Sequence, residues 1–100
     1  MEVANKEKSR SLLKSGTGHD PTVEDLLFGI TIALVDDRNE VQVTSVTKAS
    51  GTVFQVTVAP TDVGKIIGKD GRTAMSIRTL LSAIGVATKT RYRLEIVTRR

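Results

Sequence analysis

The chain has 100 residues, 39% of them hydrophobic, and a formal net charge of +4 at pH 7. This length supports one modest hydrophobic core, so a single domain is expected. The absence of cysteine excludes disulfides and thiolate metal sites. The sequence has no apolar run of about 18 residues, and residues 1–20 lack the apolar segment of a signal peptide, so we expect a cytoplasmic protein.

The positive charge is concentrated in the C-terminal part of the chain. Residues 61–100 contain nine Lys or Arg and three Asp or Glu, whereas residues 1–60 contain six basic and eight acidic residues. This division is typical of a domain with one polyanion-binding surface, and a solvated basic face would give the same counts. Charge alone leaves both interpretations open.

Residues 1–20 are rich in Lys, Ser, Glu and Gly, which predicts a flexible N-terminal tail. A helix is expected from Pro21 to about Leu34, because proline is favoured at a first helical position and apolar residues then recur at helical spacing. The alternating apolar residues of 28–34 also fit a strand, and Gly29 weakens a helix interior by about 1 kcal/mol.

Two strands are expected at about 41–46 and 52–58, because apolar and polar residues alternate in both segments. The residues between them, 48–51, predict a turn, and Pro60 ends the second strand. A third strand over 92–97 shows the same alternation.

A short helix is expected over 61–67, with Ile66 and Ile67 turned toward the core. Gly64 would leave room for close approach by a neighbouring element or a ligand, and Gly68 would end the helix. A long amphipathic helix should follow from Arg72 to about Ile84, with Gly85 as its stop. Its expected core face consists of Ala74, Ile77, Leu80, Leu81 and Ile84.

The expected order is therefore helix, strand, strand, helix, helix, strand, which defines an α+β domain. A right-handed crossover through the two consecutive helices would make strand 52–58 parallel to strand 92–97. Strand 41–46 would pair antiparallel at an edge. The result is a three-stranded mixed sheet covered on one face by three helices.

The segment Ile66-Ile67-Gly68-Lys69-Asp70-Gly71-Arg72 places two glycines three residues apart between two helices. Glycines allow a sharp turn with no Cβ in the way, so a sugar-phosphate backbone could approach the main chain closely. Lys69 and Arg72 add positive charge near the positive end of the helix dipole. Asp70 repels phosphate, and we expect it to face solvent or to accept backbone N–H bonds.

An apolar pair, Gly, two variable residues and Gly is the signature of the KH domain. From residue 63 to 85 the sequence VGKIIGKDGRTAMSIRTLLSAIG resembles the small bacterial RNA-binding KH proteins of the KhpA-like family. DLLFGITIALVDDRNEVQV and RYRLEIV also fit, so the resemblance covers about residues 21–98, the expected KH domain. Because the last strand ends at Val97, the extra helix and strand must precede the core, as in type II KH domains.

The resemblance implies a site for single-stranded RNA, of which KH modules hold about four nucleotides. Phosphates would lie on the GKDG loop, and bases would turn toward an apolar groove formed by the short helix and the sheet. The implied RNA-binding residues are Gly64, Ile67, Gly68, Lys69, Asp70, Gly71 and Arg72. A post-transcriptional regulator or RNA chaperone acting as a dimer is the implied function.

The resembled family is thought to act as homodimers or with a second, larger KH-containing protein. Met75, Thr79 and Ser82 lie on a flank of the long helix away from its apolar face, and they are the expected dimer face. The alternative is a KH-shaped interaction or dimerisation scaffold that binds little RNA. The two functions differ at Lys69, since only an RNA clamp should be sensitive to Lys69→Asp.

Catalysis, metals and cofactors are not expected. The single histidine, His19, lies in the predicted tail, and the adjacent carboxylates at 36–37 are typical of a solvated helix end. The segment from Gly64 to Asp70 differs from a phosphate-binding P-loop, because the glycines are too close and Asp70 replaces the Ser or Thr that binds magnesium.

Overall fold

The computed structural model describes residues 21–98, so the predicted tail at 1–20 lies outside the described residues. The predicted element order and the α+β class are confirmed. The elements are α2 (Pro21–Leu34), η1 (Arg38–Glu40), β1 (Gln42–Lys48), β2 (Gly51–Val58), η2 (Pro60–Asp62), α3 (Val63–Ile67), η3 (Lys69–Gly71), α4 (Arg72–Thr88) and β3 (Tyr92–Thr98). Within these residues, no helix is long and apolar enough to cross a membrane.

The sheet has the order β1-β2-β3, with β2 in the centre. β1 pairs antiparallel with β2, and β2 pairs parallel with β3, as the crossover predicts. At the middle of the sheet, Val56 pairs with Val43 on one side and with Ile96 on the other. The extra helix and strand precede the core, so the type II arrangement is confirmed.

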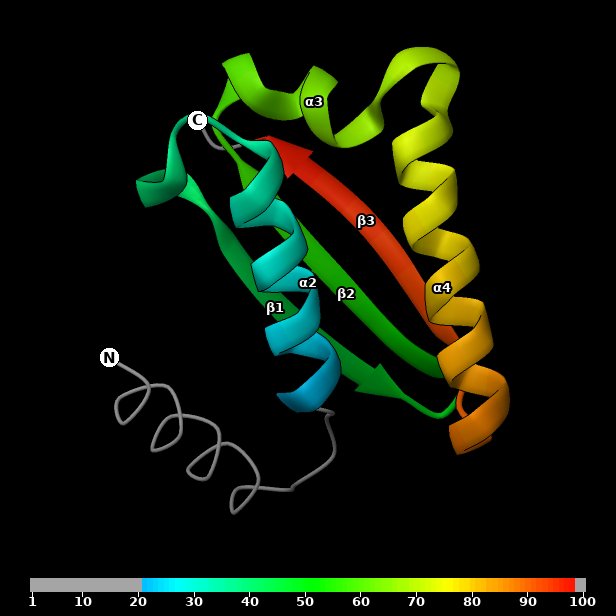
Figure 1. The fold of residues 1–100 in the computed structure, drawn as a ribbon. Coiled ribbons are helices and arrows are strands. Elements are labelled where there is room, and N and C mark those ends of the chain that lie inside the picture. Colours follow the sequence, from blue (N-terminus) through cyan, green and yellow to red (C-terminus); the bar gives the residue numbers. More distant parts are fainter. Residues whose placement is uncertain (1–20, 99–100) are drawn as a thin grey trace, which may run out of the picture.

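The three α-helices lie against one face of the sheet (Figure 1). The central strand β2 alternates accordingly: Phe54, Val56 and Val58 are buried toward the helices, while residues at 53, 55 and 57 are half-buried on the other face. Phe54 also contacts Tyr92 of β3, with ring centroids 5.3 Å apart. The core therefore lies between the helices and a single sheet face.

The segment 21–34 is a helix, because its core residues follow a helical period. Val23, Leu27 and Thr31 are buried, and the Thr31 hydroxyl donates to the Leu27 carbonyl at 2.7 Å. Phe28 is exposed, so the strand-like alternation of apolar residues does not describe this segment.

Two predictions for the long helix are wrong. Leu80 was expected in the core, but 43% of it is exposed. Gly85 was expected to end the helix, but α4 continues to Thr88, and Gly85 is buried inside it. A Cβ on Gly85 would lie 2.4 Å from the carbonyl oxygen of Thr90, so this glycine allows close packing of the following turn. Lys89 ends α4 in the left-handed conformation, with φ of 57°.

Candidate nucleic-acid interface

The GKDG loop joins α3 to α4 through three residues with positive φ, Gly68, Asp70 and Gly71. Gly68 has φ of 79°, and Gly71 has φ of 74°, values that favour glycine. A Cβ on Gly68 would also lie 2.2 Å from the Thr73 hydroxyl oxygen, so no other residue fits there without displacement. Asp70 adopts φ of 57°, a left-handed conformation that Asp tolerates better than most residues.

Backbone hydrogen bonds close the loop at both ends. The Gly68 N–H donates to the Gly64 carbonyl at 2.8 Å, the Gly71 N–H to the Gly68 carbonyl at 3.1 Å, and the Arg72 N–H to the Lys69 carbonyl. None of these three bonds uses the N–H of Lys69 or Asp70. Lys69, Asp70 and Arg72 are exposed, and the first turn of α4 contains no acidic residue. Such a loop before a helix N-terminus suits an anion.

Gly64 and Ile67 border this loop on α3. Ile67 was expected to turn toward the core, but 39% of it is exposed, because α3 has one turn and Ile66 alone fills its buried face. Gly64 was expected to allow close approach by a neighbouring element or a ligand. A Cβ there would meet no atom within 4 Å, so no neighbouring element approaches it, and room for a ligand stays a prediction. Both residues therefore lie open at the surface beside the loop.

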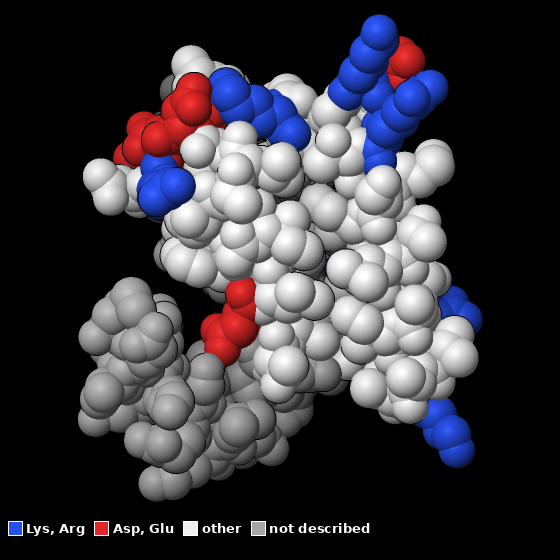
Figure 2. All heavy atoms as spheres, in the orientation of Figure 1, with Lys and Arg blue, Asp and Glu red and all other residues white. Residues whose placement is uncertain are grey.

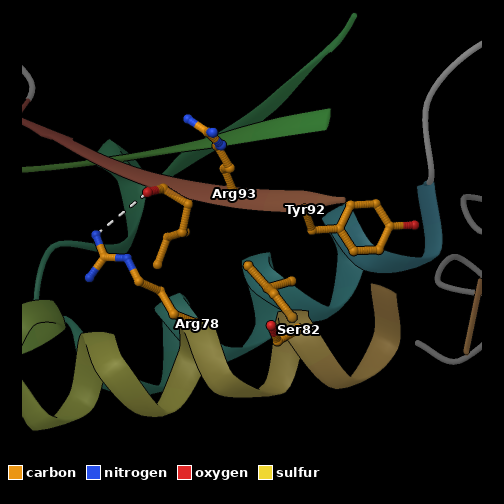
Figure 3. A pocket seen from close by; sticks show the side chains of 6 residues that line it. Arg78, Ser82, Tyr92 and Arg93 are labelled. Carbon is orange, nitrogen blue, oxygen red and sulfur yellow. Dashed lines mark hydrogen bonds between the residues drawn. The ribbon is translucent and has the colours of Figure 1, made fainter. Parts of the chain in front are cut away.

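A hollow of about 290 Å³ lies between α4 and the edge strand β3 (Figure 3). Its lining residues are Arg78, Leu81, Ser82, Tyr92, Arg93 and Leu94. The Arg78 guanidinium reaches across it to the Leu94 carbonyl at 3.5 Å, and Arg93 extends from the other side of β3 (Figure 3). Sequence reasoning missed this hollow. Arg78 is the only charged residue in 73–88, and this isolated charge on the long helix could have indicated a polar site there.

A buried carboxylate anchors the start of α3, the helix that leads into the loop. Asp62 is fully buried and accepts the backbone N–H groups of Asp36 at 3.2 Å and Asp37 at 2.9 Å, just after α2. The Lys65 ammonium lies 3.3 Å from Asp62 and 3.4 Å from Asp36. Lys65 is thus engaged by two carboxylates, and the α3 N-terminus is tied to the end of α2.

These contacts shift two pKa values. The N–H of Asp37 is the main cause that lowers the pKa of Asp62 below its ordinary 3.8, and it acts with Asp36 and Lys65 against the opposing effect of burial. The pKa of Lys65 is raised above 10.5, chiefly by its hydrogen bond to Asp62. Both groups are therefore charged at neutral pH.

Charge is unevenly distributed over the helical side of the molecule (Figure 2). Acidic side chains gather where α2 ends and η1 begins, with basic side chains beside them, and mainly basic side chains project where α3 turns into α4 (Figures 1 and 2). The surface of α2 and α4 between these two regions is largely uncharged (Figure 2). Anions would thus be drawn to the GKDG end of α4 and away from the end of α2.

The predicted dimer-face residues are exposed along α4. Met75 is 65% exposed and shares a shallow surface hollow with Arg72, Ser76 and Thr79. Ser82 is exposed at the border of the hollow beside β3. Val86, which sequence reasoning did not single out, is 81% exposed. It follows Ser82 by four residues, the same step that separates Met75 from Thr79.

No cluster of three or more His, Cys, Asp or Glu side chains that could hold a metal ion occurs among residues 21–98, and His19 lies outside this range.

Comparison with known proteins decides the family. A sequence model of the KhpA/KhpB KH domain matches residues 24–96. The chain belongs to the KhpA/KhpB KH-domain family. The RNA-binding protein KhpA of Treponema pallidum is 50% identical over 74 residues, which are 74% of this chain and 92% of that protein.

Two further relatives align over a similar part of the KH domain. The RNA-binding protein KhpA of Clostridium acetobutylicum is 43% identical over 75 residues, 75% of this chain and all of that protein. The one of Listeria monocytogenes is 36% identical over 75 residues, which are 99% of its length. The family resemblance inferred from GKDG and its flanking helices is confirmed.

Proposed function

We propose that this KH domain binds single-stranded RNA, with GKDG as a backbone clamp for about four nucleotides. The observation that carries the proposal is the loop geometry: two positive-φ glycines, two N–H groups outside the loop's own bonds, and exposed Lys69 and Arg72. The relatives' shared name, RNA-binding protein KhpA, supports the same ligand. RNA of a bacterial cell lies in the cytoplasm, which is the proposed location.

The site residues have distinct proposed roles. Gly68 and Gly71 shape the turn, the N–H groups of Lys69 and Asp70 receive phosphate oxygens, and the Lys69 and Arg72 side chains supply charge. Gly64 and Ile67 form an open apolar rim on α3 that bases would contact. Asp70 weakens phosphate binding without blocking the loop, because its side chain is exposed to water.

The proposed form is a dimer that works as a post-transcriptional regulator or RNA chaperone. Met75, Thr79, Ser82 and Val86 repeat at steps of four, three and four residues, which is the spacing of a helix-pairing stripe. Pairing along α4 would place two clamps on one RNA and raise the overall affinity through effective concentration. The partner is a second copy or a larger KH-containing protein.

The test compares RNA binding by wild type, Lys69→Asp and the control Arg38→Asp. Both variants change the net charge by the same amount, but Arg38 lies on η1 in the acidic region. A fluorescent single-stranded RNA pool at low and moderate salt should bind Lys69→Asp roughly tenfold more weakly, and Arg38→Asp nearly as well as wild type.

Circular dichroism must show all three proteins folded. Equal losses in the two variants would mean that binding follows net charge rather than the clamp. Absence of binding by the wild type would reject the proposed function and favour the alternative, a KH-shaped interaction scaffold.

A further inference from the structure

A second basic cluster lies at the far end of α4 from the GKDG loop. Lys48 ends β1, Lys89 ends α4, and Arg91 and Arg93 lie at the start of β3. All four side chains are exposed. Since α4 has 17 residues, the cluster and the GKDG loop are separated by about 25 Å along the helix.

Strand pairing brings three of these cations to one hollow. Lys48 pairs with Gly51 across the β1–β2 turn, and the Thr52 N–H donates to the Arg91 carbonyl at 2.8 Å. Gly51 adds no side chain to the space that they enclose. The hollow measures about 240 Å³, and its charged lining residues are Lys48, Arg91, Arg93 and Glu95.

Three cations and one carboxylate line this hollow. The Glu95 carboxylate accepts a hydrogen bond from the Gln55 amide at 3.0 Å, so part of its acceptor capacity is used within the sheet. Guanidinium groups bind phosphate through paired N–H donors, and two of the three cations are arginines. The hollow therefore has the chemistry of a phosphate site.

Arg93 connects this hollow to the GKDG side of the molecule. It lines both the hollow at the hairpin and the one between α4 and β3, where Arg78 stands on the α4 wall (Figure 3). An anionic strand that leaves the GKDG loop along α4 would meet Arg78, then Arg93, then Arg91 and Lys48. No Asp or Glu lines the hollow between α4 and β3.

We infer that the hairpin hollow of Lys48, Arg91 and Arg93 is a second phosphate-binding site for the RNA strand held by GKDG. The inference rests on the proposed function. It extends the RNA footprint from the clamp, along the edge strand β3, to the outer face of the sheet. Short RNA occupies the clamp alone, whereas longer RNA engages both ends of α4.

The test measures binding of 4-nucleotide and 16-nucleotide single-stranded RNA to wild type, Arg91→Gln, Arg93→Gln and the control Arg38→Gln, over a range of salt. Each variant removes one exposed charge and leaves the backbone bonds of the sheet in place. Arg91→Gln and Arg93→Gln should each bind the 16-mer about two- to fivefold more weakly, with the log–log salt slope reduced by about 0.7. Arg91→Gln and Arg93→Gln should bind the 4-mer with nearly wild-type affinity. The control Arg38→Gln should bind both RNAs with nearly wild-type affinity.

Failure of this inference differs from failure of the proposed function. If Arg91→Gln and Arg93→Gln bind the 16-mer with the same affinity as Arg38→Gln, the hairpin hollow holds no RNA phosphate. The proposed GKDG clamp would not be affected by this result. If the two variants weaken the 4-mer as much as the 16-mer, the cluster acts as general charge and the second site is rejected. If the wild type binds neither RNA, the proposed function itself fails.

Discussion

At the scale of single residues, Asp62 has a role that its position along the chain does not suggest. An aspartate just before a helix usually caps it, but Asp62 makes no capping hydrogen bond to α3. Its carboxylate instead binds two backbone N–H groups that follow α2, 25 and 26 residues earlier. The last residue of η2, just before α3, thereby fixes the position of α3 relative to α2.

The lowered pKa of Asp62 gives a pH-dependent prediction. Because the folded-state pKa lies below the ordinary 3.8, the carboxylate stabilises the fold above that pH, and its contribution is lost as the pH falls further. Asp62→Asn should therefore lower the thermal midpoint by several degrees at pH 7, and the gap to wild type should narrow below pH 3.8. Thermal melts by circular dichroism at pH 7, 5 and 3 measure the difference in thermal midpoint between Asp62→Asn and wild type.

The control is Asp37→Asn, which keeps the backbone N–H that Asp62 accepts and removes an exposed carboxylate. It should melt close to wild type at each pH. A gap between Asp62→Asn and wild type that is the same at pH 7 and pH 3 would contradict the assigned role.

At the scale of elements, α4 is the long helix that belongs to both the proposed clamp and the proposed dimer. Its buried face is formed by Ala74, Ile77, Leu81 and Gly85, and one flank carries exposed Met75 and Val86. Met75 and Val86 are the apolar ends of a stripe whose middle positions are Thr79 and Ser82, and its steps of four, three and four residues are those of a helix-pairing surface.

Met75→Glu combined with Val86→Glu should dissociate the proposed homodimer, because pairing would bring like charges together at an apolar seam. Sedimentation equilibrium at micromolar concentration should give about twice the 10.8 kDa chain mass for wild type and the single-chain mass for the variant. The control Asn39→Glu, on exposed η1, should stay dimeric. If the wild type sediments as a single chain, the homodimer is rejected. Pairing with a different KH protein would then be the remaining form of the dimer proposal.

Sequence periodicity and general rules of connection predicted the order and pairing of most elements. For residues 21–34 the apolar pattern fitted both a helix and a strand, and the family resemblance favoured the helix. Periodicity failed at Gly85 and Leu80, because the end and the buried face of α4 depend on how the Thr90 turn and the sheet pack against them. The contact of Asp62 with residues after α2, and the hollow between α4 and β3, join distant segments that no local pattern encodes.

At the scale of the whole molecule, the fold separates charge along its surface. Acidic residues surround the end of α2, and basic residues stand at both ends of α4. Lys65 lies close to the GKDG loop in sequence, but Asp62 and Asp36 engage it. In the proposed clamp, the charge offered to RNA therefore comes from Lys69 and Arg72. Few phosphates are neutralised at one clamp, which predicts weak binding with a shallow salt dependence for short RNA.

Backbone amide NMR of the full chain, titrated with a 4-nucleotide single-stranded RNA, locates the binding site. The amide signals of Lys69 and Asp70 should shift the most, with smaller shifts at Gly64, Ile67 and Arg72, and with η1 unchanged. Shifts confined to other surfaces, or spread evenly over all exposed basic residues, would contradict the GKDG clamp.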